Sequence, residues 1–175
     1  MRIALALAAC LSFAGTAGAQ ATNPVSDAIR SSWTGARTNI RESAEQMPEA
    51  DYGFRPVESV RTFGQMLAHV AGANYVFCAA AKGEAAPHAE DAFEKTATTK
   101  PAIVKALDDS LAYCDAAFAA LTDATAGESV TMPFGMPNAP RVSALAGNTG
   151  HLNEHYGNLV TYFRIKGMVP PSSRR

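Results

Sequence analysis

Four stretches of this chain carry apolar residues at spacings of three and four, the period of an α-helix that lies against a core. They cover residues 24–47, about 59–83 or 62–83, about 99–121, and 143–167. No stretch shows the strict alternation of apolar and polar residues that is typical of a half-buried strand. The pattern therefore predicts an all-α chain built from four long helices.

Local signals mark the ends of these helices. Asn23 before Pro24 is an N-cap followed by a proline at the first helical position. Thr62 and Gln65 have the spacing of a capping box, and Gly83 is placed as a C-cap. These signals agree with the apolar periodicity on where each helix begins and ends.

The N-terminus has the composition of a secretory signal peptide. A basic residue at Arg2 precedes an apolar run over 3–14, and Ala17 and Ala19 form an A-x-A cleavage site. The run is too short to cross a bilayer. We expect a signal peptide at 1–19, and a mature chain of one domain at 20–175 that is periplasmic or secreted after cleavage near Ala19.

The balance of charge and hydrophobicity limits the partners of the mature chain. The formal net charge is −1 at pH 7, which argues against nucleic acid. No second apolar segment follows the N-terminal one, so no membrane span is expected. A small-molecule substrate is the expected partner, and a homodimer is left open.

Three of the four histidines are placed to meet at one point. His151 and His155 are four residues apart, so a helix puts both imidazoles on one face. His69 lies on the flank of the apolar stripe of another helix, and a solvent-open cleft between the two helices suits this placement. His88 belongs to the polar connection over 84–98 and is expected to be a loop histidine. Ordinary packing or surface histidines are the alternative interpretation.

Three imidazoles would suit a divalent metal ion. Zinc binds neutral histidine nitrogen at about 2.0–2.1 Å, and catalytic zinc sites use three protein ligands with one position left for water. Nickel also accepts imidazole, so zinc or nickel is expected. Glu154 lies between the two histidines but should face solvent, and it receives no role. Helical position makes Asn148, Asn158 and Tyr162 candidates to orient a ligand or the substrate.

A longer pattern resembles a known family. The segment Phe54-Arg-Pro-Val-Glu-Ser-Val-Arg-Thr-Phe-Gly-Gln-Met-Leu-Ala-His69, followed by His151-x-x-x-His155-x-Gly157, is similar to the DinB/YfiT-like proteins over nearly the whole mature chain. The resemblance implies an up-down-down-up four-helix bundle. It also implies a metal bound by His69, His151 and His155, with thiol-dependent transferase, isomerase or hydrolase chemistry.

The resemblance gives two hypotheses for function and leaves one question about the cysteines. The first hypothesis is a metal-dependent hydrolase or transferase that acts on a small molecule, and the alternative is a non-catalytic bundle that binds a metal or ligand.

Cys78 and Cys114 could form a disulfide only if their helices run parallel; two buried free thiols are the favoured interpretation.

The connection over 122–142 contains an unusually apolar piece, Met132-Pro-Phe-Gly-Met-Pro137. A solvated connector has little reason to carry these side chains, so this loop is expected to pack on the bundle. It covers either the mouth of the site or the end of the bundle.

Overall fold

The computed structural model describes residues 22–174. The signal peptide expected at 1–19 lies outside these residues and stays a prediction. None of the described helices is long and apolar enough to cross a membrane.

Four long helices make up most of the described chain: α1 (Pro24–Gln46), α2 (Phe63–Lys82), α4 (Lys100–Ala120) and α6 (Arg141–Ile165). The capping box of Thr62 and Gln65 is present, and Gly83 ends α2 in the left-handed conformation with φ of 75°. The short elements are η1 (Glu49–Asp51), α3 (Ala92–Thr96), α5 (Asp123–Ala126), β1 (Ser129–Val130), β2 (Ala139–Pro140) and η2 (Pro171–Ser173). The all-α prediction is confirmed, although α3, α5 and the β1–β2 pair were not expected.

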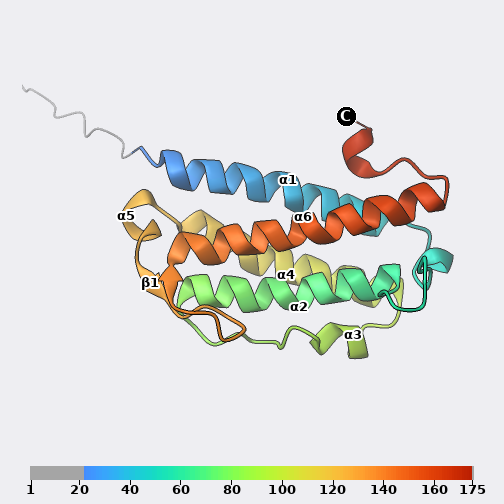
Figure 1. The fold of residues 1–175 in the computed structure, drawn as a ribbon, viewed down its shortest axis with the longest axis horizontal. Coiled ribbons are helices and arrows are strands. Elements are labelled where there is room, and N and C mark those ends of the chain that lie inside the picture. Colours follow the sequence, from blue (N-terminus) through green and yellow to red (C-terminus); the bar gives the residue numbers. More distant parts are fainter. Residues whose placement is uncertain (1–21, 175) are drawn as a thin grey trace, which may run out of the picture.

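The long helices form the up-down-down-up bundle (Figure 1). Each of α1 and α2 packs against both α4 and α6, so α1 and α2 lie on a diagonal. Trp33 of α1 contacts Asp115 of α4, and Arg41 contacts Asp108, so contacts move back along α4 as they advance along α1 and the two helices run antiparallel. Helices α2 and α4 run parallel, because both of their C-terminal halves meet at one disulfide.

Aromatic and leucine side chains fill the space between the helices. Trp33 stacks on Phe118 with ring centroids 4.4 Å apart, and Phe63 meets Phe163 edge-on at 5.6 Å. The three phenylalanines are essentially inaccessible to solvent. Burial of one such side chain contributes roughly 1.5–3 kcal/mol, so this core is sufficient to hold the bundle around any polar site.

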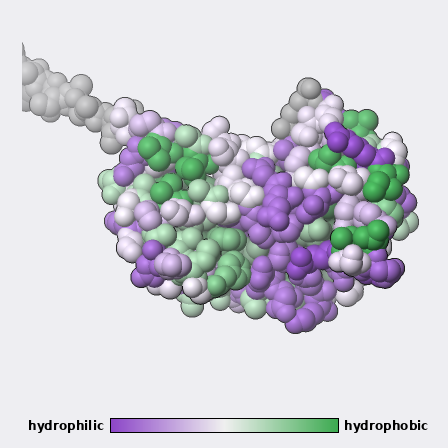
Figure 2. Space-filling view, viewed as in Figure 1, coloured by the Kyte–Doolittle hydropathy of each residue, from purple (hydrophilic) through white to green (hydrophobic). Residues whose placement is uncertain are grey.

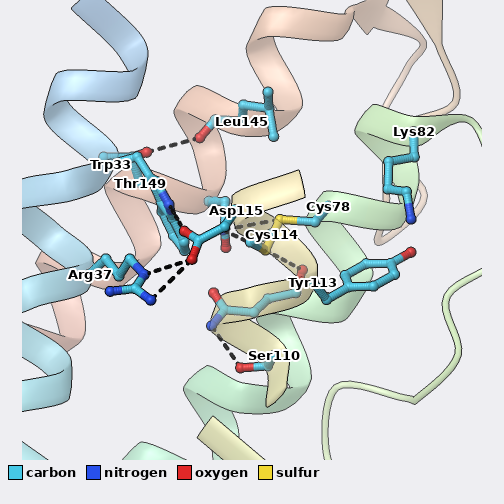
Figure 3. Close-up of a disulfide and its surroundings, with 12 residues drawn as sticks. Trp33, Arg37, Cys78, Lys82, Ser110, Tyr113, Cys114, Asp115, Leu145 and Thr149 are labelled. Atoms are coloured by element: carbon cyan, nitrogen blue, oxygen red, sulfur yellow. Dashed lines mark hydrogen bonds and ion pairs between the residues drawn. A yellow bond between two sulfur atoms is a disulfide. The ribbon is translucent and has the colours of Figure 1, made fainter. Parts of the chain in front are cut away.

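The two cysteines of the described chain form a disulfide between α2 and α4 (Figure 3). The Cα atoms of Cys78 and Cys114 are 5.4 Å apart and both residues are fully buried. The favoured expectation of two free thiols is therefore wrong. The reason is topological: helices that run parallel bring the two C-terminal halves level with each other, which is the case in which the pairing was expected to be feasible.

Candidate metal centre

Helices α2 and α6 carry the three histidines that the sequence brought together. His69 lies in the second turn of α2, while His151 and His155 occupy successive turns in the middle of α6. Helices α2 and α6 pack side by side in opposite directions. In this packing the second turn of α2 lies level with the middle of α6. The packing thus places all three imidazoles at one level of the bundle.

The nitrogen atoms of the three rings converge closely. The Nε2 atom of His151 is 3.2 Å from that of His69 and 3.0 Å from that of His155. One ligand nitrogen from each ring lies within 4.8 Å of the other two. Two nitrogens bound to one zinc ion are about 3.3 Å apart at a tetrahedral angle and about 2.9 Å at a right angle. The observed spacing therefore fits three ligands of one ion.

The rings are more deeply buried than the sequence suggested. His69 is 5% exposed and His155 is 7% exposed, so these two rings lie deeper than an open cleft would place them, although a groove lined by His155 opens beside the cluster. Burial lowers the pKa of His151 to about 3 and that of His155 to about 4, and it also lowers the pKa of His69. At neutral pH all three imidazoles are uncharged and carry a lone pair, which is the form that binds a metal.

A carboxylate from outside the bundle orients the first ring. Glu94 of α3 lies 3.1 Å from Nδ1 of His69. Since an ionised carboxylate only accepts hydrogen bonds, Nδ1 must carry the proton and Nε2 is left with its lone pair toward the other histidines. Arg61 fixes Glu94 in turn, donating from Nε to Oε2 at 3.0 Å. Carboxylate–histidine pairs of this kind orient metal-binding imidazoles in proteins.

The other candidate residues have different positions. The hydroxyl of Tyr162 donates to the backbone carbonyl of Arg61 at 2.7 Å, so Tyr162 supports the residue that holds Glu94. The amide nitrogen of Asn158 lies 3.5 Å from Nδ1 of His155, at the edge of hydrogen-bonding distance. Asn148 lies elsewhere: its amide nitrogen is 3.5 Å from both sulfurs of the disulfide. These contacts of Asn148 are with the disulfide that joins α2 and α4, and not with the histidines.

The imidazole of His151 lacks one hydrogen-bond partner. Within residues 22–174, Nδ1 of His151 is buried and has no hydrogen-bond partner, although Nε2 faces both other rings. A buried imidazole without a partner is unfavourable for the folded state. Its retention between two other imidazoles is understandable if the three Nε2 atoms share a common partner such as a metal ion.

A polar groove opens beside His155. It has a volume of about 590 Å³, and its lining residues are Ser59, Val60, Arg61, Gln65, Met66, Glu94, Glu154, His155 and Asn158. Glu154 is exposed as expected and stands on the rim. Figure 2 shows a band of hydrophilic side chains that crosses the middle of α6 and α2 and reaches α3. The groove gives a small polar molecule access to the histidine cluster.

The apolar loop lies on the other side of the cluster. The ring of Phe134 is 5.5 Å from that of Phe77, and the ring of Phe77 is 5.8 Å from that of His151. Phe134 has φ of 58° and remains 54% exposed. The loop thus reaches His151 only through Phe77, and it contributes no residue to the lining of the groove, so neither expected position is established.

Sequence reasoning did not identify Glu94, and it noted Arg61 only as part of a longer motif. The polar 84–98 connection shows no periodicity that would place Glu94 against α2. The placement depends on α3, a helix of five residues, which is too short for a periodic signal.

Comparisons with known proteins agree with the fold of this chain. The model of the DinB superfamily matches residues 32–159. The chain is similar to a DinB-like protein from Bacillus cereus ATCC 10987, with 18% sequence identity and a TM-score of 0.69 over 83% of this chain and 95% of that chain. No curated protein matches the sequence.

Two other solved structures have the same fold. A mycothiol-dependent maleylpyruvate isomerase aligns with 16% identity and a TM-score of 0.64 over 77% of this chain. This chain spans only 60% of that isomerase. A conserved protein from Enterococcus faecalis aligns with 14% identity and a TM-score of 0.62, over 81% of this chain and 95% of that chain. At these identities the likeness establishes the fold alone.

Proposed function

The chain belongs to the DinB superfamily, and we propose that it is a metal-dependent hydrolase or transferase that acts on a small molecule at the three-histidine site. The observation that carries the proposal is the convergence of three Nε2 atoms, with neighbouring pairs 3.0 and 3.2 Å apart. In this proposal His69, His151 and His155 hold one divalent ion, zinc or nickel.

The donor set is suited to catalysis. When bound by three neutral ligands, a divalent ion keeps its full charge and polarises a bound water or substrate heteroatom strongly. Glu94 keeps the His69 tautomer that points its lone pair inward. Arg61 stands at the wall of the groove, where its guanidinium can attract an anionic group of a substrate while it holds Glu94.

The class of substrate follows from the size and polarity of the groove. About 590 Å³ suits a small molecule and is too small for a folded macromolecule. The isomerase with the same fold is, by its name, mycothiol-dependent, which supports thiol-dependent transfer as one reaction to test here. We also propose that the mature chain acts outside the inner membrane, on the basis of the signal-peptide pattern at 1–19.

The proposal is tested with untagged protein, because a histidine tag would bind metal itself. Zinc and nickel are counted by inductively coupled plasma mass spectrometry, before and after treatment with a chelator and again after refilling. We expect one ion per chain, and a rate in panels of hydrolase and thiol-transferase substrates that is lost on chelation and restored by the metal. Protein that takes up neither ion would overturn the proposal.

The same experiment separates the enzyme from the binding module. A full complement of metal with no turnover on either panel would contradict catalysis and favour a bundle that holds a metal or ligand. A chelator-sensitive rate would exclude that alternative.

A further inference from the structure

The connection between α2 and α4 is anchored on Tyr75 of α2, one turn beyond Gly72. His88 and Phe93 both pack on Tyr75 of α2, with ring centroids 4.8 and 6.0 Å from the tyrosine ring. The two rings also contact each other at 4.9 Å. In the sequence, Glu90 lies between His88 and Phe93. Because both of these residues pack on Tyr75, the backbone of Glu90 is held against α2.

A glycine makes this close approach possible. A Cβ atom added to Gly72 would lie 1.9 Å from the carbonyl oxygen of Glu90 and 2.6 Å from its carbonyl carbon. Real Cβ atoms do not approach backbone atoms so closely, so only glycine allows this backbone to rest on the helix. Gly72 is one turn from His69, on the same face. The sequence thus places the backbone of Glu90 beside the first histidine.

The side chain of Glu90 points toward the nitrogen atoms that face one another. Its Oε1 atom is 3.7 Å from Nε2 of His69, whereas Glu94 lies on the opposite, Nδ1 side of the same ring. Two ligands of one ion, each about 2.1 Å from it, are about 3.4–3.6 Å apart at angles of 109–120°. The measured separation is close to that range.

The side chain of Glu90 is held by fewer contacts than that of Glu94. Its side chain is 38% exposed, and the pair with His69 is its one salt bridge within residues 22–174. It lies outside the set of nitrogens that are all within 4.8 Å of one another, so a rotation of the side chain is needed to reach their centre. Arg61 holds both oxygens of Glu94.

We propose that Glu90 is a fourth protein ligand, whose carboxylate binds the ion held by the three histidines. The inference rests on the proposed metal site and adds a charge to it, because one carboxylate compensates half of the charge of a divalent ion. The donor would come from a segment outside the four long helices. It would therefore be the most displaceable of the four ligands when a substrate enters from the groove.

The test compares three substitutions in the full-length mature chain. Zinc affinity is measured by competition with a chromogenic chelator for Glu90→Gln, Gly72→Ala and Glu154→Gln. Glu154→Gln is the matched control, because it removes one exposed carboxylate from the rim of the groove. We expect Glu90→Gln to weaken binding by at least about tenfold. Gly72→Ala should do the same by displacing the backbone, and Glu154→Gln should change affinity by less than about threefold.

Cobalt provides a second readout that does not depend on activity or on net charge. The visible absorption of Co²⁺ reports its coordination number and ligands, so Glu90→Gln should change the spectrum and Glu154→Gln should leave it as in the unmodified protein. An unaltered spectrum and affinity in Glu90→Gln would overturn the inference while the three-histidine site remained. Failure of the unmodified protein to bind metal would instead overturn the proposed function. If Gly72→Ala does not fold, Glu90→Gln alone decides.

Discussion

Helix α2 has two interfaces that differ in almost every respect. Toward α4 it is closed by a disulfide, and the amide nitrogen of Asn74 donates to the hydroxyl of Ser110 at 3.0 Å, while Oδ1 of Asn74 is buried without a partner in the described chain. Toward α6 it brings together three imidazoles whose nitrogens face one another, and Nδ1 of His151 lacks a partner in the described chain. The first interface is closed by a covalent link, whereas the second brings together three side chains that could hold a metal ion.

One interface of α2 thus contributes mainly to stability, and the other carries the proposed metal site. The disulfide and the filled core stabilise the fold. The face of α2 toward α6 can therefore keep buried, unprotonated imidazoles that add little to the free energy of unfolding. A cost to the folded state at functional residues is common in enzymes and binding sites. Changes at the α4 interface should therefore lower stability and spare metal binding, and changes at the α6 interface should do the reverse.

The largest expected effect is at the disulfide. The double substitution Cys78→Ala and Cys114→Ala removes a link across 36 residues of sequence, and the chain-entropy relation puts the loss at about 4 kcal/mol. Urea unfolding under oxidising conditions measures it. Zinc affinity of the folded variant should stay within about threefold of the unmodified protein. Equal stability of the two proteins would contradict the role given to this interface.

At the other interface, His151→Ala should weaken zinc binding by at least about a hundredfold, because Nε2 of His151 lies 3.2 Å from Nε2 of His69 and 3.0 Å from Nε2 of His155. Its metal-free stability should change by less than about 1 kcal/mol, since the buried Nδ1 has no partner to lose. Calorimetric titration and urea unfolding give the two numbers. Asn153→Ala is the control, as this residue is exposed on the same helix; if it weakened binding equally, the site would be misassigned.

A smaller effect on zinc affinity is expected for Glu94, which contacts the ring of His69 and is not itself a proposed ligand. Glu94→Gln keeps the size of the side chain but loses the charge that favours a proton on Nδ1 of His69, so zinc affinity should fall about tenfold. Competition with a chelator measures it. Glu84→Gln, in the same connection but paired with Lys82, should leave affinity unchanged. Equal affinities for both variants would show that Glu94 does not orient the ring.

The smallest effect, when compared near neutral pH, concerns the pH dependence of the metal-free protein. The folded-state pKa of His151 is about 3, while in the unfolded chain it is near 6.5, so below pH 6.5 the unfolded chain binds the additional proton. Stability is therefore lost as pH falls. His151 contributes about 0.4 kcal/mol of this loss at pH 6.5, and more below it. Urea unfolding of chelator-treated protein between pH 8 and 5 should show a shallower slope for His151→Ala; identical slopes would contradict the burial of this imidazole.

The long helices were predictable because their signals are local. The capping box of Thr62 and Gln65, the C-cap Gly83 and the proline at Pro24 all lie within a few residues of the ends that they mark. Helical wheels placed His69, His151 and His155 on matching flanks for the same reason. The pairing of Cys78 with Cys114 was different, because it depends on the relative direction of two helices, which no local signal encodes.

The surroundings of the histidines could not be predicted from periodicity. Glu90 and Glu94 come from a connection without a repeat, and their placement depends on tertiary contacts such as the one over Gly72. The depth of the rings was also misjudged. A helical wheel gives the side of the helix on which a residue lies, but it does not show which neighbouring segment buries that residue. Here the connection that contains α3 packs on α2 and helps to bury His69.

The most direct test of the account is a crystal structure of the untagged protein grown with zinc, with data collected on both sides of the zinc absorption edge. The account predicts one anomalous peak per chain, in contact with Nε2 of His69, His151 and His155. A peak at His88 alone, or no peak among the three rings at saturating zinc, would contradict it.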